Sequence, residues 1–147
     1  MKLSKLLSPE RVVDLEAADK AGVLRELCGV MSTSKTVKDA AAFRKAIEER
    51  ESILSTGIGL GLAIPHAKVS AVKDFTVAIG RAKKGIAWDS LDGNPVTLVV
   101  MIGANDRQAA EYTKVLAAVV SRVKDEALRK KIAAAPKPSD VFALLAD

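Results

Sequence analysis

The apolar residues of this chain follow two different spacings, which alternate along the sequence. Apolar residues three or four positions apart predict amphipathic helices, whereas short apolar or alternating runs predict buried strands. Strands are predicted over residues 11–15, 62–64, 75–80 and 96–102. Helices are predicted over residues 37–50 and behind N-caps at Asp19, Asn105-Asp106, Asp125 and Ser139, after a short helical turn over residues 1–7.

The order of these elements indicates the fold class. Helices precede, separate and follow the predicted strands, so we expect an α/β protein in which helices flank both faces of a mixed β-sheet. A chain of 147 residues is one domain by size. We therefore predict a single three-layer α/β/α domain over residues 1–147.

A glycine-rich run ends in the only histidine of the sequence. Residues 57–61 hold three alternating glycines that disfavour a helix, while residues 62–64 are typical of a short buried strand. Pro65 has no backbone N–H to donate to a sheet. The strand is therefore predicted to stop at Pro65. This puts His66 just beyond its C-terminal end, at the sheet edge where α/β proteins bind ligands.

The position of His66 is compatible with two interpretations. Imidazole is largely neutral near pH 7, and it can accept a transferred group covalently and pass it on. A structural histidine that caps the strand end through a hydrogen bond to the backbone fits the same pattern. A dinucleotide-binding loop is excluded, because the glycines do not follow the Gly-x-Gly-x-x-Gly spacing and a strand, not a helix, comes next.

Composition narrows the function classes. The formal net charge is +5, but the lysines and arginines are scattered among acids, and the clusters over residues 81–84 and 129–131 contain no aromatic residue for base stacking. We therefore expect solvated basic faces and no nucleic-acid partner. No apolar run is long enough to span a bilayer, and the N-terminal run is too short and too soon polar for a signal peptide, so no direct membrane insertion is expected.

The single cysteine and the single histidine limit the chemistry further. Cys28 alone cannot form an internal disulfide, which fits a cytoplasmic protein. Its place on the apolar side of a predicted helix favours a buried, inert thiol. One histidine and one cysteine make a zinc site from soft ligands implausible, so no metal is expected.

Two separated motifs resemble one known family. Arg50-Glu51, Ser55–Gly59 and Gly61–Ala67 look like the active-site signature of the enzyme IIA domains of the phosphoenolpyruvate-dependent sugar phosphotransferase system, in the fructose–mannitol class that includes a nitrogen-regulatory branch. The run Gly85–Val96 also matches, with Trp88 where phenylalanine is usual. We expect the Trp88 ring to pack in the core. The resemblance covers nearly the whole chain, and the fold it implies agrees with the α/β/α prediction.

The resemblance implies a phosphocarrier. Such a protein accepts a phosphoryl group from a phosphohistidine on the HPr carrier protein, holds it on His66, and passes it to an enzyme IIB domain, in sugar uptake or its regulation. Phosphoryl transfer needs positioning and compensation of negative charge, and the sequence requires neither a metal nor another cofactor. The alternative is a regulatory module that binds a target protein according to the phosphorylation state of His66.

The same match assigns roles to other residues. Arg50 would stabilise phosphoryl oxygens, although its position at a predicted helix end also fits a surface arginine that pairs with Glu51 or complements the helix dipole. Thr56 and the backbone N–H groups of Gly57 and Gly59 would add hydrogen bonds to the bound phosphoryl group.

The sequence departs from the family at one position. Members usually carry a second histidine in a run like His-Leu-Lys-x-Leu. Aligning residues 112–116 with that run puts Tyr112 at the histidine position, and a register shifted by one residue would put Glu111 there. A tyrosine hydroxyl donates a hydrogen bond to a phosphoryl oxygen but brings no positive charge. Tyr112 is therefore a predicted substrate-binding residue, with packing of its ring against the core as the alternative.

Overall fold

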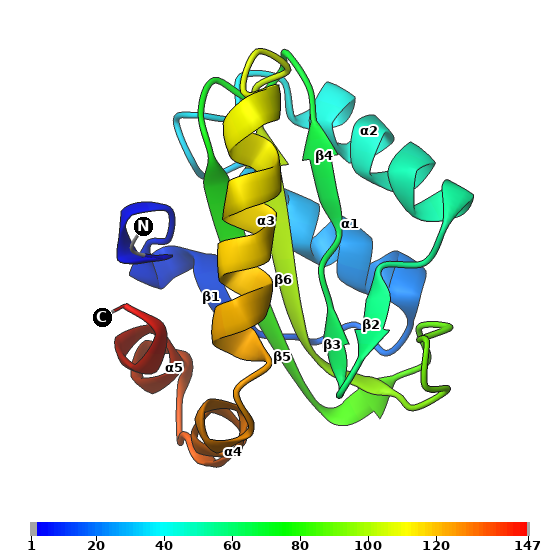
Figure 1. Ribbon diagram of the computed structural model, residues 1–147, viewed down its shortest axis with the longest axis vertical. Coiled ribbons are helices and arrows are strands. Elements are labelled where there is room, and N and C mark those ends of the chain that lie inside the picture. Colours follow the sequence, from blue (N-terminus) through cyan, green and yellow to red (C-terminus); the bar gives the residue numbers. More distant parts are fainter. Residues whose placement is uncertain (1–2, 147) are drawn as a thin grey trace.

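A mixed β-sheet forms the middle layer of the protein (Figure 1). The computed structural model describes residues 3–146, and within them six strands pair in the order β1-β5-β6-β3-β2, with β4 also on β6. The strands are β1 (Val12–Asp14), β2 (Gly57–Gly59), β3 (Leu62–Ala63), β4 (His66–Lys68), β5 (Thr76–Ile86) and β6 (Val96–Ala104). β5 and β6 are antiparallel, as are β2 and β3, whereas β1 runs parallel to β5 and both β3 and β4 run parallel to β6, so the prediction of a mixed sheet is confirmed.

Helices cover both faces of this sheet (Figure 1). One face carries α1 (Lys20–Met31) and α2 (Ala40–Ile53), and the other carries α3 (Ala109–Val123), α4 (Glu126–Ala134) and α5 (Pro138–Leu145). The side chains of β5 alternate between two apolar clusters: Val77 and Ile79 pack with α3 to α5, and Ala78 packs with α1 and α2. The predicted α/β/α arrangement is thus confirmed.

Short 3₁₀ turns precede β1, namely η1 (Leu3–Lys5) and η2 (Pro9–Arg11). The first lies inside the helical turn predicted over residues 1–7, of which residues 1–2 are outside the described residues. Residue 147, the last of the predicted domain, is outside them as well.

Two of the predicted helix caps are correct and two are wrong. Asp19 and Asp125 each accept backbone N–H groups of the first turn, as predicted. Gln108, not Asn105-Asp106, precedes α3, because the Asn105 side chain instead accepts the Arg107 N–H and so forms a local turn. The last helix begins at Pro138 behind Lys137, one residue before the predicted cap.

The predicted strand does stop before Pro65, since β3 ends at Ala63, but a new strand that was not predicted starts at His66. Pro65 has no N–H to donate, so it interrupts the hydrogen bonding between the strands. Its carbonyl nevertheless accepts the Ile102 N–H at 3.0 Å, and pairing with β6 resumes at the next residue. His66 is therefore the first residue of β4, opposite Ile102 in β6. This places the histidine inside the sheet and not in a loop beyond it.

The basic run over residues 81–84 is not a uniform solvated face. Arg81 is only 4% exposed and forms an ion pair with Asp14, with 2.7 Å between its Nε and the nearer carboxylate oxygen. Its Nη1 donates to the carbonyls of Ile132 and Ala135 at the end of α4. Buried arginines are tolerated where every donor has a partner, and here the arginine joins β1, β5 and α4.

Two predictions about buried side chains are confirmed. The Trp88 ring is fully packed in the core beneath α1 and α2. Cys28 is buried in the same cluster, and burial raises the pKa of its thiol to about 12. The thiol therefore stays protonated and unreactive near neutral pH.

Candidate functional site

His66 is held by the backbone two residues before it. Its side chain is half-buried, and its Nδ1 lies 2.6 Å from the carbonyl oxygen of Ile64. A carbonyl oxygen can only accept a hydrogen bond, so the neutral ring carries its proton on Nδ1. Nε2 therefore keeps its lone pair and is the nucleophilic nitrogen.

The surroundings of His66 keep the imidazole neutral. Burial lowers the pKa of His66, and the positive charge of Arg50 lowers it further, while the hydrogen bond to the Ile64 carbonyl and the negative charge of Glu51 act in the opposite direction. The net pKa lies below the ordinary value of 6.5. A histidine with a lowered pKa is unprotonated at neutral pH and available as a nucleophile.

Arg50 lies in the last turn of α2, which extends three residues beyond the predicted end. Its Nη1 donates to the Leu54 carbonyl at 2.8 Å, which caps the helix. No other hydrogen bond or ion pair of its guanidinium occurs among residues 3–146, so the remaining N–H groups are unoccupied. The alternative pairing of Arg50 with Glu51 does not form, because the Glu51 carboxylate binds Lys20.

Thr56 is buried, and both of its hydrogen-bond donors are occupied. Its backbone N–H and its hydroxyl both donate to the Glu51 carboxylate, at 2.8 and 2.6 Å. The structure therefore leaves Thr56 no free donor for a phosphoryl group, contrary to the role expected for it. The threonine is instead part of the support beneath the site.

The glycines of the run serve the backbone geometry of the hairpin. A Cβ at Gly57 would lie 2.6 Å from the Ser90 hydroxyl, so Gly57 allows close packing of β2. Gly59 has a φ of 91° and starts the left-handed turn between β2 and β3. Figure 1 shows this turn at the end of β3 that points away from β4. The structure brings His66, Arg50 and Tyr112 together, but not Gly59.

Tyr112 of α3 faces the histidine, as the unshifted alignment predicted. The two ring centroids are 5.8 Å apart, and Glu111 beside it is exposed. Burial raises the pKa of Tyr112 to about 12, so its hydroxyl remains a neutral donor at physiological pH. The hydroxyl makes no hydrogen bond among the described residues.

Sequence reasoning missed two charged residues of the site. Lys68 lies two positions after His66 in β4, and its Nζ lies 5.7 Å from the Tyr112 ring centroid. It brings a positive charge to the side where the family carries its second histidine. The alternation of a strand would have put Lys68 on the same face as His66, but no strand was predicted over residues 66–68. Glu51 is the other, and no local pattern marked it as buried.

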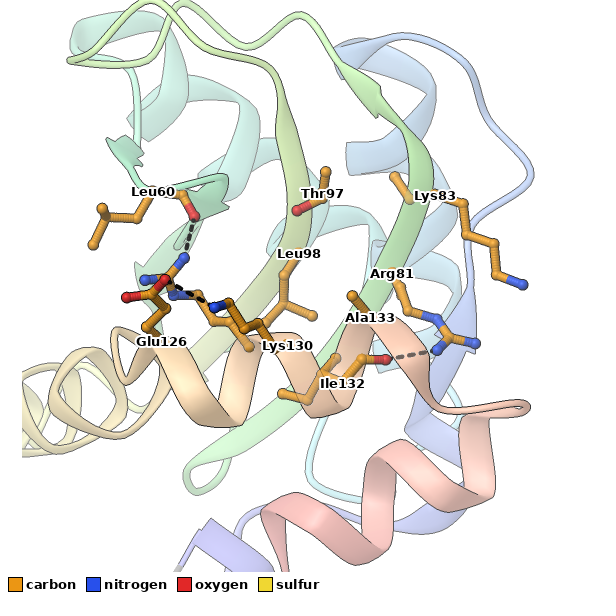
Figure 2. A pocket seen from close by; sticks show the side chains of 11 residues that line it. Leu60, Arg81, Lys83, Thr97, Leu98, Glu126, Lys130, Ile132 and Ala133 are labelled. Carbon is orange, nitrogen blue, oxygen red and sulfur yellow. Dashed lines mark hydrogen bonds and ion pairs between the residues drawn. The ribbon is translucent and has the colours of Figure 1, made fainter.

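A cavity of about 500 Å³ lies elsewhere, between α4, the β2–β3 turn and the adjacent parts of β5 and β6 (Figure 2). None of the predicted site residues lines it. Arg81 and Lys130 are held in ion pairs, and Figure 2 shows Lys83 extending away from Leu98. Since none of the residues that the motifs around His66 single out reaches this cavity, it is not the candidate site.

Comparison with known proteins agrees with the motifs around His66. The family described as "Phosphoenolpyruvate-dependent sugar phosphotransferase system, EIIA 2" matches residues 5–147. The chain belongs to this family. EIIA domains are phosphoryl-transfer components in sugar uptake or nitrogen regulation, and the predicted resemblance is confirmed.

Relatives of this EIIA chain occur in both roles. The fructose-specific EIIABC component of Bacillus subtilis is 36% identical over 90% of the chain, which spans only 21% of that longer protein. The nitrogen regulatory protein IIA-Ntr from Neisseria meningitidis has a TM-score of 0.89 and 25% identity, over 97% of this chain and 98% of that one. Mannitol IIA of Escherichia coli, solved in complex with phosphorylated IIB, shares the fold with a TM-score of 0.79 at 21% identity, over 96% and 99% of the two chains.

The surface of the EIIA chain near Arg50 is unusually apolar. Ile53 is 80% exposed and Leu54 is 67% exposed at the end of α2, and Leu91 is 83% exposed on the segment that packs on β2. Neighbouring exposed apolar residues such as Ile53 and Leu54 are typical of surfaces that bind other proteins.

Two features are absent from residues 3–146, the part of the chain that the structure describes. None of its helices combines the length and the apolar character that crossing a membrane demands. Residues 3–146 also contain no group of three or more histidine, cysteine, aspartate or glutamate side chains placed to hold a metal ion.

Proposed function

We propose that this protein is a phosphocarrier that accepts a phosphoryl group from phospho-HPr on Nε2 of His66 and passes it to an enzyme IIB domain. The observation that carries the proposal is the 2.6 Å hydrogen bond from Nδ1 to the Ile64 carbonyl. That bond leaves Nε2 with a free lone pair in a histidine whose pKa is lowered.

The transfer step needs no proton to move. Nε2 attacks the phosphorus, the N–P bond to the donor histidine breaks, and the donor nitrogen leaves with the electron pair of that bond. The His66 ring then carries both the Nδ1 proton and the phosphoryl group, so positive charge develops on it. The Ile64 carbonyl stabilises that charge, and the reverse sequence delivers the phosphoryl group to the nucleophile of the next protein.

Three side chains from different elements would compensate the phosphoryl charge. The unoccupied N–H groups of Arg50 supply charge-assisted hydrogen bonds to the phosphoryl oxygens. The neutral Tyr112 hydroxyl adds a further donor, and Lys68 adds a positive charge beside it. The exposed apolar surface at Ile53 and Leu54 adjoins Arg50 and suits the docking of a partner protein. Residues 1–147 would act as one EIIA domain.

Incubation with phosphoenolpyruvate, enzyme I and HPr tests the proposal, with phosphate on the protein read by mass. We expect one acid-labile phosphoryl group that is absent from His66→Ala. Addition of an enzyme IIB domain should remove it from the protein. Phosphate that survives mild acid, or that persists in His66→Ala, would contradict the proposal.

A regulatory role is the second candidate, and the likeness to IIA-Ntr of Neisseria meningitidis favours it. In that case the phosphoryl group on His66 controls the binding of a target protein. Phosphorylated protein and His66→Ala would then bind the target with different affinity, while transfer to enzyme IIB would be slow or absent.

A further inference from the structure

A chain of hydrogen bonds runs from a buried carboxylate in α2 to the ring of His66. Glu51 is 7% exposed, and its two oxygens accept the N–H and the hydroxyl of Thr56, at 2.8 and 2.6 Å. The Thr56 carbonyl accepts the Ile64 N–H at 3.1 Å. The Ile64 carbonyl in turn accepts Nδ1 of His66 at 2.6 Å. Each link fixes the backbone that makes the next one.

Two residues from outside this chain hold its first link in place. Lys20 of α1 forms an ion pair with Glu51 at 2.8 Å, and its Nζ lies 5.3 Å from the Trp88 ring centroid. The Trp88 indole N–H donates to the Thr56 hydroxyl oxygen at 3.4 Å. A phenylalanine at this position would fill the core similarly but would have no such donor.

Stability alone does not account for this arrangement. Burying an ion pair recovers little net free energy, and apolar residues of similar volume commonly stabilise a fold as well or better. Apolar residues would not, however, fix the orientation of Thr56. The directional hydrogen bonds of the Glu51 carboxylate therefore hold Thr56 in an orientation that apolar packing would not fix.

We propose that Glu51 is a positioning residue for His66, acting through Thr56 and Ile64, and that the Trp88 indole completes its support. This deepens the proposed function, since it concerns the same histidine. The carboxylate holds the Ile64 carbonyl where it binds Nδ1–H, and so keeps the lone pair on Nε2. Its negative charge also favours the positive charge that develops on the ring during transfer.

The test compares Glu51→Gln and Trp88→Phe with the unaltered protein. Because the chain has one histidine, its ¹⁵N and ¹H signals report directly which ring nitrogen carries the proton. We expect Glu51→Gln to lower the fraction with the proton on Nδ1 and to slow phosphoryl uptake about tenfold or more, as displaced reacting groups do. Trp88→Phe should also lower the fraction with the proton on Nδ1, and it should slow phosphoryl uptake by about twofold to fivefold.

The matched control is Glu49→Gln, which removes an exposed carboxylate from the same helix and should change neither quantity. If Glu51→Gln or Trp88→Phe lowers the melting temperature but leaves the protonated nitrogen and the uptake rate unchanged, Glu51 is merely structural and the proposal fails. Should Glu51→Gln not fold, Trp88→Phe decides alone. The NMR signals of the His66 ring can be recorded without phosphorylation. If the proposed function is wrong, the unaltered protein takes up no phosphate, and this outcome is distinct from a failure of the role proposed for Glu51.

Discussion

The chemistry of His66 depends on a few charges and one carbonyl. The Ile64 carbonyl selects the protonated nitrogen, and burial together with Arg50 lowers the pKa of the ring. The hydrogen bond to the Ile64 carbonyl and, to a smaller extent, the negative charge of Glu51 raise the pKa and partly oppose these effects. The result is a neutral imidazole whose Nε2 is available as a nucleophile.

Removal of the Arg50 side chain should slow transfer with little loss of stability. Arg50→Ala loses charge-assisted contacts to the phosphoryl group, which by analogy with single oxyanion donors costs about 2–4 kcal/mol of barrier, or about 30- to 1,000-fold in rate. The measurement is the rate of phosphoryl uptake from phospho-HPr. Proton NMR of the single histidine should show its pKa raised in the same variant, because a nearby positive charge is gone.

Arg44→Ala is the control for this prediction. Arg44 lies on the same helix, is exposed, and pairs with Glu48 at 3.5 Å, so its loss should alter neither the rate nor the pKa of His66. An unchanged transfer rate with a lowered melting temperature in Arg50→Ala would assign Arg50 a structural role only.

Tyr112 offers a test of the departure from the family pattern. Tyr112→Phe removes a neutral donor and should slow transfer by about twofold to tenfold. Tyr112→His restores a group that can carry positive charge and should raise the transfer rate or the lifetime of the phosphohistidine. If Tyr112→Phe leaves the transfer rate unchanged and Tyr112→His destabilises the protein, the ring only covers the core.

Lys68→Gln should also slow transfer, because it removes the cation over the Tyr112 ring.

At the level of elements, the site depends on how closely β2 approaches the segment that carries Trp88. The Ser55 hydroxyl donates to the Trp88 carbonyl at 2.8 Å, and the Leu91 N–H donates to the Gly57 carbonyl at 3.1 Å. These contacts join the end of α2 and the start of β2 to the connection between β5 and β6. The position of Thr56, and through it that of His66, follows from this packing.

A pair of glycine substitutions tests how closely β2 packs against the segment that carries Trp88. In Gly57→Ala the added Cβ would lie 2.6 Å from the Ser90 hydroxyl and 3.0 Å from the Ser90 Cα, so we expect a loss of about 1–3 kcal/mol of stability. Gly29→Ala is the control, because Gly29 lies in the last turn of α1 and a Cβ there meets nothing within 4 Å. It should stabilise the protein by about 0.5–1 kcal/mol. Equal effects in denaturant unfolding would contradict the prediction.

At the level of the whole molecule, Arg81 joins the layers on one side of the sheet. Its guanidinium binds Asp14 of β1 through two nitrogens and caps the carbonyls of Ile132 and Ala135 at the end of α4. This contact ties the edge strand and the C-terminal helices to β5. It lies apart from His66, so its loss should weaken the fold without changing the chemistry.

Asp14→Asn should destabilise the whole protein, because the buried Arg81 charge loses its counter-ion. The Asp14 side chain is 41% exposed, so solvent screens part of this effect, and the expected loss is about 1–3 kcal/mol, or about 2–12 °C in Tm for a chain of this size. The hydrogen bonds from Arg81 hold the pKa of Asp14 below its ordinary value of 3.8. Its contribution is therefore complete above that value and is lost as the pH falls through the lower, folded-state pKa.

The pH dependence of unfolding checks this prediction. The unaltered protein should lose stability below pH 3.8 more steeply than Asp14→Asn, since the variant has no carboxylate to protonate at this position. An exposed carboxylate gives the control: Glu126→Gln removes an i,i+4 pair and should cost less than about 1 kcal/mol. Parallel acid profiles for Asp14→Asn and the unaltered protein would contradict the prediction.

Local sequence patterns were sufficient to predict the main helices and strands, the family and two of the buried side chains. The spacing of apolar residues predicted the helices and the central strands, because burial on one face imposes that spacing. The sequence around Arg50 and His66 indicated the family. The lone cysteine was correctly expected to be buried, and Trp88 was correctly expected to pack in the core.

Tertiary structure decided what the local patterns left open. His66 became the start of a strand because β6 offered a partner for the chain beyond Pro65, which no local signal shows. Glu51, Lys20 and Thr56 meet in a buried cluster, although each is ordinary in its own segment. Lys68 lies over the Tyr112 ring, and Arg81 is buried against Asp14. Each of these contacts also joins segments that are distant in the sequence. Sequence patterns record which side of an element is buried, but the partner of a polar side chain depends on which distant elements the fold brings against it.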